Sequence, residues 1–200
     1  MNNGIIDGKK LMTSDSEYQN RIKAYKWDDL SRLWESIKGQ NTLEWDDGKA
    51  FEYLILQSFF LEGAEVRWPY SVRLDGAEIE QIDGVIYLDN LACLIECKDY
   101  NSGQVGKKKN ISFESVAKIR NQLMRRPSSA IASVFSSGGF TKPAMTLANF
   151  VHPQTILLWR GSEVEYCLSR KAFSKSLTNK YRKCIEFGIY DYDITIEEEL

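Results

Sequence analysis

The chain has 200 residues and a mass of 23.0 kDa, and 43% of its residues are hydrophobic, 12% aromatic and 27% charged. This length suits one domain with a single hydrophobic core, and the composition excludes a chain that is disordered over most of its length. No stretch approaches the roughly 18 uncharged apolar residues of a membrane span, and residues 1–10 lack a basic segment followed by an apolar one. We therefore expect a cytoplasmic protein without a membrane span or a secretory signal.

The four cysteines are Cys93, Cys97, Cys167 and Cys184. An extended strand rises about 3.3 Å per residue, so Cys93 and Cys97 would lie roughly 13 Å apart and could not share a metal ion. Without an export signal, the sequence predicts reduced, partly buried thiols rather than disulfides or a metal site.

Charge is segregated along the chain although the net charge is only −2. Residues 42–100 carry thirteen acids and four bases, a net charge of −9, whereas residues 107–126 carry seven bases and one acid, a net charge of +6. Residues 160–183 carry seven bases and two acids, a net charge of +5. An acidic block between basic blocks suits a cation-binding centre flanked by a phosphate-contacting surface, and solvated helix faces explain it equally well.

Two segments in the first third of the chain show the apolar spacing of helices. Between Ser16 and Ile37, apolar residues recur every three or four positions, which predicts one or two amphipathic helices. A further helix of about four turns is predicted after Asp47, with Gly63 as its end. Its apolar face is formed by Phe51, Leu54, Ile55 and Phe59.

Three short runs rich in Val, Ile, Leu and Tyr follow, at Ala64–Leu74, Glu78–Leu88 and Leu91–Lys98. Asp75-Gly76 and Asp89-Asn90 separate them, and both pairs are typical of hairpins or tight turns. The sequence therefore predicts three consecutive antiparallel strands.

The second half of the chain alternates between helices and strands. A polar loop at Tyr100–Asn110 precedes a helix that is predicted from about Ser112 to Met124 and stops before Pro127. The elements predicted next are a buried strand (Ala130–Phe135), a glycine-rich turn (Ser136–Phe140), a helix that Thr141 caps and that runs to about Phe150, an apolar strand (Thr155–Trp159), a basic helix (Ser169–Lys183) and an acidic tail (Ile185–Leu200). This order predicts an α/β sandwich around one mixed sheet.

Charged residues interrupt two of the predicted strands. Asp83 lies in the second strand, and Glu96 and Lys98, two residues apart in the third, face one side while Cys97 faces the other. If the two strands pair, Asp83 meets that pair across the ladder. Such charges cost free energy unless they are paired or bind an ion. Glu96 and Lys98 could neutralise each other, whereas Asp83 and Glu96 together favour a hard cation such as Mg²⁺.

Glu52 is an acid within an otherwise apolar helical segment. It is a further candidate for the same site, and a solvent-facing position on the helix explains it equally well. Helical Glu52, then Ile82-Asp83-Gly84, then Leu94-Ile95-Glu96-Cys97-Lys98 resembles the PD-(D/E)xK nuclease superfamily, which has the restriction-endonuclease-like fold. Ile82 stands where that pattern has proline.

A second motif resembles the Mrr-like members of this superfamily. Ser137–Ala144 (SGGFTKPA), with Ala148 beyond it, resembles their G-F-T-x-x-A turn and helix, and Gln81-x-Asp83-Gly84 is similar as well. The resemblance covers roughly residues 47–159. It implies an αβββαβ core with a mixed central sheet flanked by helices. The implied division is an N-terminal helical extension (1–44), a nuclease core (45–160) and a C-terminal extension that packs on the core and ends in the acidic tail (161–200).

The resemblance also implies catalytic roles. Asp83, Glu96 and the backbone carbonyl of Cys97 would hold Mg²⁺, for which Mn²⁺ could substitute, and Glu52 would reach the metal directly or through water. Lys98 would orient the nucleophile or stabilise the transition state. Further candidates for contacts with phosphate are Lys118 and Gln122, one turn apart on the next helix, and the run Lys107-Lys108-Lys109.

The function implied is that of a Mg²⁺-dependent DNA endonuclease, and the Mrr-like features imply restriction or anti-phage defence. Mrr-like enzymes usually carry a separate recognition domain, whereas only about 45 residues precede the predicted core here. We therefore expect a homodimer or the nuclease subunit of a multi-protein defence complex. Two alternatives are a structure-selective nuclease of repair or recombination, and a non-catalytic nucleic-acid-binding or assembly module that kept the fold.

Overall fold

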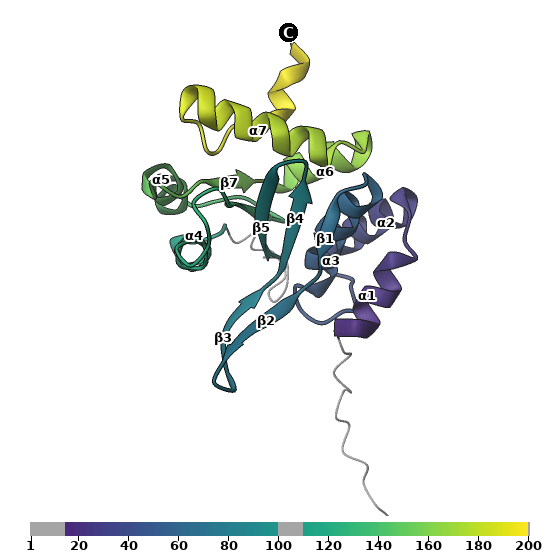
Figure 1. Cartoon of the computed structure of the whole chain (residues 1–200). Coiled ribbons are helices and arrows are strands. Elements are labelled where there is room, and N and C mark those ends of the chain that lie inside the picture. The colour runs from purple at the N-terminus through teal and green to yellow at the C-terminus, as the bar shows by residue number, and fades with distance from the viewer. Residues whose placement is uncertain (1–14, 100–109, 200) are drawn as a thin grey trace, which may run out of the picture.

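In the computed structural model, which describes residues 15–99 and 110–199, a five-stranded mixed sheet is the middle of three layers (Figure 1). In spatial order, its strands are β1 (Glu65–Arg67), β4 (Gly84–Leu88), β5 (Leu91–Lys98), β6 (Ile131–Ser136) and β7 (Ile156–Trp159). β1 and β5 each pair antiparallel with β4, and β6 pairs parallel with both β5 and β7. The predicted α/β fold around one mixed sheet is confirmed.

Helices cover both faces of this sheet. On one face lies α3 (Lys49–Leu61), against which α1 (Asp15–Lys23) and α2 (Trp27–Lys38) pack. The opposite face is covered by α4 (Phe113–Leu123) and α5 (Lys142–Phe150) (Figure 1). The elements after β7 are α6 (Gly161–Arg170), α7 (Phe173–Phe187) and the short 3-10 helix η1 (Ile194–Glu199), and they share the core on the α3 side.

Two hydrophobic cores lie on the two sides of the sheet. Ile95 and Cys97 of β5 belong to the larger core under α3, whereas Leu94 belongs to the smaller core under α4 and α5. Because successive residues of a strand face opposite sides, Glu96 and Lys98 face α4. The prediction that this pair faces away from Cys97 is confirmed.

Most helices and strands form where the hydrophobic pattern predicts them. The segment 16–37 becomes α1 and α2, and α3 follows with Gly63 just beyond its end, at a left-handed φ of 90° that suits glycine. β5, α4, β6, α5 and β7 lie within one residue of their predicted bounds. All four cysteines are free and buried, as predicted.

The first two predicted strands were wrong in one respect, because each is broken in two. Ala64–Leu74 splits into β1 and β2 (Tyr70–Leu74), and Glu78–Leu88 splits into β3 (Ala77–Ile82) and β4. Pro69, between β1 and β2, has no N–H to donate to a ladder. β2 and β3 form a separate two-stranded ribbon that projects from the body of the molecule (Figure 1). Asp83, which was predicted within a strand, lies between β3 and β4.

The predicted basic helix Ser169–Lys183 was also wrong, because the chain turns between α6 and α7. Lys171 caps α6 in the left-handed conformation, with φ and ψ both 53°. The acidic tail is ordered in part, since Tyr190 and Ile194 are buried in the core on the α3 side.

Two predicted segments fall largely outside the described residues, namely the N-terminal tail and the polar loop with Lys107-Lys108-Lys109. Among residues 15–99 and 110–199, no helix has the length and apolar character required to cross a bilayer.

Gly84 begins β4 and allows α3 to lie close to the sheet. A Cβ at this position would lie 2.4 Å from Cδ2 of Leu56 and 3.2 Å from the carbonyl oxygen of Arg67. Leu56 follows Glu52 by four residues, so both lie on the same face of α3. The close approach at Gly84 therefore also brings Glu52 toward Asp83.

We expect Gly84→Ala to lower the free energy of unfolding by about 1–3 kcal/mol, because the added methyl group overpacks the contact between α3 and β4. Urea unfolding measures this loss. Gly39→Ala is the matched control, since Gly39 has a φ of −83° that alanine adopts readily and lies at the end of α2. An equal loss in both variants would contradict the packing role of Gly84.

Candidate active site

Asp83 and Glu96 meet where β4 begins. The last described pair of the β4–β5 ladder is Gly84 with Ile95, so the next positions outward are Asp83 and Glu96. Oδ2 of Asp83 accepts a hydrogen bond of 2.8 Å from the backbone N–H of Cys97. A side chain thus takes the place of the next ladder bond, which gives a physical reason for the break between β3 and β4.

Glu96 is fully buried and contacts two lysines. Nζ of Lys98 lies 2.7 Å from Oε1, and Nζ of Lys118, from α4, lies 2.7 Å from Oε2 and 3.0 Å from Oε1. Lys98 is on the same face of β5 as Glu96, and α4 covers that face. Both contacts therefore follow from the alternation of β5 and from the helix packed on it.

Glu52 reaches the site from the other side of the sheet. Its side chain is 12% exposed, so the alternative of a solvent-facing helix position was wrong. Lys49, one turn earlier on α3, lies 2.8 Å from Oε2 of Glu52 and 3.7 Å from a carboxylate oxygen of Asp15. Glu52 is thus largely shielded from solvent and has a lysine partner of its own.

The buried charges shift one another's pKa values. Burial, the negative charge of Glu96 and that of Glu52 raise the pKa of Asp83 to about 7. Burial also raises the pKa of Glu52, and the charge of Lys49 opposes that shift. Burial alone would lower the pKa of Lys98, but the charges of Glu96 and Asp83 outweigh it and raise the pKa above its usual value.

The donor atoms fit a hard cation that completes its shell with water and phosphate. Among the described side chains, no three His, Cys, Asp or Glu residues form a ready metal cage. Mg²⁺ is usually held by only one or two protein carboxylates together with water and phosphate oxygens, and Asp83 and Glu96 match that number. The carbonyl of Cys97 points to the same edge of β5 as its N–H, which faces Asp83. Glu52, paired with Lys49, suits a contact through water.

Of the two candidates on α4, only Lys118 reaches the site. The side-chain amide of Gln122 instead donates to the backbone carbonyl of Gln81, at 3.0 Å. Arg126 pairs with Glu80 at 2.6 Å, one residue before Gln81. These contacts hold α4 and the turn that follows it against β3, immediately before Asp83.

The glycine-rich turn after β6 supports the end of β5. The N–H of Ser137 donates to the carbonyl of Lys98 at 3.2 Å, and the N–H of Gly161, at the start of α6, donates to the carbonyl of Gly138 at 2.9 Å. Thr141 caps α5 by accepting a hydrogen bond from the N–H of Ala144, as predicted. In this chain the turn therefore positions the backbone that carries Lys98.

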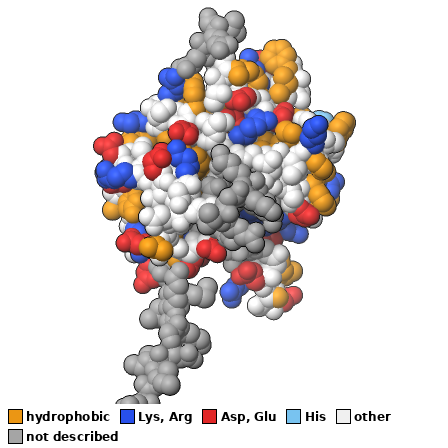
Figure 2. Space-filling model, turned by 180° about the vertical axis from the view of Figure 1, so that it is seen from behind, with side chains coloured by type: hydrophobic (Ala, Val, Ile, Leu, Met, Phe, Trp, Pro, Cys, Tyr) orange, Lys and Arg blue, Asp and Glu red, His pale blue; other side chains and the backbone are white. Residues whose placement is uncertain are grey.

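Some bases of the two basic stretches form ion pairs in the structure. Among the described residues, these ion pairs include Lys118–Glu96, Arg125–Glu80, Arg126–Glu80, Arg160–Asp191, Arg160–Glu163 and Lys180–Glu163. Figure 2 shows Lys, Arg, Asp and Glu side chains interspersed over the face that it presents. At least five of the fourteen bases in the two stretches are thus paired within the molecule, which neither interpretation of the blocks had anticipated.

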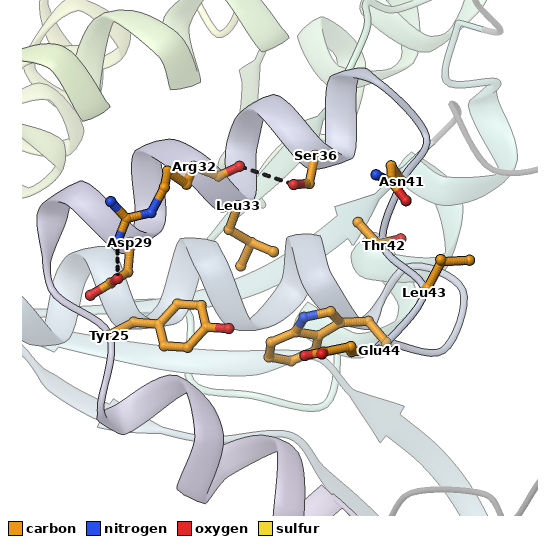
Figure 3. A pocket seen from close by; sticks show the side chains of 10 residues that line it. Tyr25, Asp29, Arg32, Leu33, Ser36, Asn41, Thr42, Leu43 and Glu44 are labelled. Atoms are coloured by element: carbon orange, nitrogen blue, oxygen red, sulfur yellow. Dashed lines mark hydrogen bonds and ion pairs between the residues drawn. The ribbon is translucent and has the colours of Figure 1, made fainter.

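A cavity of about 370 Å³ lies elsewhere, between α2 and residues 41–45 (Figure 3). In Figure 3, Leu33 points from α2 toward the ring of Tyr25. None of Glu52, Asp83, Glu96 and Lys98 lines this cavity. Two of its three charged residues, Asp29 and Arg32, pair with each other, and the third, Glu44, is exposed, so we assign it no ligand.

Comparisons with protein-family models and with curated proteins give no match. Two solved structures are similar in part. A protein of unknown function, AF1548, aligns with a TM-score of 0.39 and 16% identity over 68% of this chain and 78% of that chain. The MspJI restriction endonuclease in complex with a 27-mer oligonucleotide aligns with a TM-score of 0.39 and 17% identity over 91% of this chain. The alignment spans only 40% of the MspJI chain. At this level of similarity, neither structure assigns a fold family or a function to the chain.

Asp83 predicts a pH dependence of stability in the absence of metal. Because its pKa is raised in the folded state, the folded protein binds more protons than the unfolded chain between about pH 4 and pH 7, so stability falls as the pH rises through that range. Asp83→Asn keeps an oxygen acceptor for the N–H of Cys97 and removes the charge. In EDTA, we expect the variant to be more stable than wild type by more than about 1 kcal/mol at pH 8, with no gain near pH 4.

Urea unfolding at several pH values tests this prediction. Asp75→Asn, in the exposed turn at the tip of the ribbon, is the control and should not change the pH profile. A loss of stability in Asp83→Asn at pH 8 would show that the ionised carboxylate is favourable where it lies.

Proposed function

We propose that this chain is a metal-dependent nuclease whose centre contains Asp83, Glu96 and Lys98. One arrangement supports the proposal above all. A buried aspartate at the start of β4 lies beside a buried glutamate and a lysine at the end of β5, and the N–H of Cys97 fixes the aspartate. The resemblance of these residues to the PD-(D/E)xK motif points to the same chemistry.

In this proposal Asp83 and Glu96 hold Mg²⁺ or Mn²⁺, with the carbonyl of Cys97 as a further ligand and Glu52 acting through water. When bound, such an ion lowers the pKa of a water and offsets charge on a phosphate. Lys98 has a raised pKa and is therefore an ammonium group at neutral pH. Its proposed role is to orient the nucleophile or to stabilise negative charge on the phosphate.

The substrate that we propose is DNA, cut within the strand at phosphodiester bonds. A second copy of the chain or a partner protein would supply recognition of the target. A role in restriction or anti-phage defence stays a prediction from the motif resemblance, as does the alternative of a structure-selective repair or recombination nuclease, which would use the same centre.

One observation favours a second candidate, a non-catalytic nucleic-acid-binding or assembly module. Both oxygens of Glu96 contact lysines, and Glu52 contacts Lys49, so both glutamates are neutralised by the chain itself. A site balanced in this way holds together without metal. Cleavage assays separate the two candidates.

The test is incubation of the purified protein with supercoiled plasmid, single-stranded DNA and RNA in Mg²⁺ or Mn²⁺. We expect metal-dependent cleavage of DNA by the wild type. Asp83→Asn, Glu96→Gln and Lys98→Met should each reduce the rate by at least about 100-fold while preserving side-chain shape. The first two remove a carboxylate charge that holds the metal, and the third removes the positive charge that acts on the nucleophile or the phosphate.

Asp75→Asn and Lys142→Met serve as matched controls, since both side chains are exposed and lie outside the site. Both controls should cleave at the wild-type rate. Cleavage that survives in all three site variants would indicate a contaminating nuclease. Metal binding without cleavage of any substrate, in a folded protein, would favour the non-catalytic module.

A further inference from the structure

Lys118 contacts Glu96 in a way that bears on metal binding. Its Nζ lies 2.7 Å from Oε2 and 3.0 Å from Oε1, and Nζ of Lys98 lies 2.7 Å from Oε1. Lys118 is therefore a close partner of Oε2, while the 2.7 Å contact of Lys98 is with Oε1. If the Lys118 ammonium group moved away, Oε2 would become available while Lys98 kept its contact with Oε1.

Lys118 is also the lysine best able to move. Its side chain is 40% exposed, against 33% for Lys98 and 17% for Lys49. It extends from α4, in a different layer from β5, on a flexible four-carbon stem. Lys98 sits on the same strand as Glu96, and the N–H of Ser137 holds its backbone carbonyl.

The balance of charges at the site determines what the entry of a metal ion would do. Glu52, Asp83 and Glu96 face three ammonium groups, on Lys49, Lys98 and Lys118. A divalent cation that entered with all three in place would add two positive charges to a site that is already balanced, and it would repel the ammonium group on the same carboxylate.

We propose that Lys118 is a displaceable counter-ion that competes with the metal for Glu96 and so restrains metal loading until it is released. This inference rests on the proposed metal site. A phosphate of the nucleic acid offers the released ammonium group a new partner. Lys118 therefore acts through Glu96 as a positioning residue and couples the arrival of the metal to that of the substrate.

The test is calorimetric titration of Mn²⁺ into the metal-free full chain without nucleic acid. Lys118→Met keeps the apolar stem and removes the charge, and we expect it to bind Mn²⁺ about tenfold more tightly than wild type. Lys118→Arg keeps the charge and should bind Mn²⁺ like wild type. Lys118→Gln, a second neutral variant, should repeat the gain if the methionine variant folds poorly.

Lys38→Met is the matched control, because Lys38 also bridges two carboxylates, Glu35 and Glu165, on α2 and α6. It should not change Mn²⁺ affinity. Thermal unfolding in EDTA and in Mn²⁺ gives a second readout, and we expect the stabilisation by Mn²⁺ to be larger in Lys118→Met than in wild type.

The outcomes separate this inference from the proposed function. Wild-type Mn²⁺ binding that the neutral variants leave unchanged or weaken would overturn the role of Lys118 and leave the metal site standing. No Mn²⁺ binding by the wild type or by any folded variant would overturn both. Tighter binding in the neutral variants, with Lys118→Arg and Lys38→Met unchanged, is the result that supports the inference.

Discussion

Carboxylates buried within reach of one another must be neutralised, and the region around the end of β5 is organised by that requirement. Glu96 is fully buried and Asp83 is nearly so. The negative charges of Glu96 and Glu52 both lie close enough to Asp83 to raise its pKa. Isolated charges of one sign in such a place would cost several kcal/mol each. The surrounding elements therefore have to deliver positive charge or hydrogen-bond donors to this point.

Each of the three layers of the fold provides a partner for one of the three carboxylates. α3 brings Lys49 to Glu52 on one side of the sheet, α4 brings Lys118 to Glu96 on the other, and the backbone of β5 offers the N–H of Cys97 to Asp83. The contact of Lys118 with Glu96 forms only if α4 lies close to the sheet, and the pair of Lys49 with Glu52 comes near Asp83 only if α3 does. Both helices therefore have to lie close to the sheet. The absence of a side chain at position 84 permits this on the α3 side, and the contacts of Arg126 and Gln122 with β3 maintain it on the α4 side.

The sequence predicted much of this region, because periodicity and alternation are local properties. The alternation of β5 placed Glu96 and Lys98 on one face, and a hairpin between neighbouring strands brought Asp83 opposite them. The pairing of Lys118 with Glu96 could not be derived in this way, because it depends on which turn of α4 lies over β5. Lys49 and Glu52 are three residues apart on a helix, a spacing typical of ion pairs, so their contact could have been predicted from the sequence. The break between β3 and β4 at Asp83 could not be predicted from the hydrophobic pattern, because the residues on both sides of Asp83 are typical of strands. The strand ends there because the Asp83 carboxylate, instead of a backbone carbonyl, accepts the hydrogen bond from the N–H of Cys97.

A second buried ion pair shows what distinguishes a structural contact from an exchangeable one. Lys180 and Glu163 are both fully buried, and Glu163 also accepts from the N–H groups of Arg160 and Ile194. Burial lowers the pKa of Lys180 although Glu163 opposes that shift. Neither group can leave without exposing an uncompensated charge in the core, so this pair joins α6, α7 and η1 permanently. In the pair of Lys118 with Glu96 only the glutamate is buried, and the lysine reaches water. The same chemistry therefore holds the C-terminal helices together at one end of the chain and, at the end of β5, leaves a carboxylate whose partner can be exchanged.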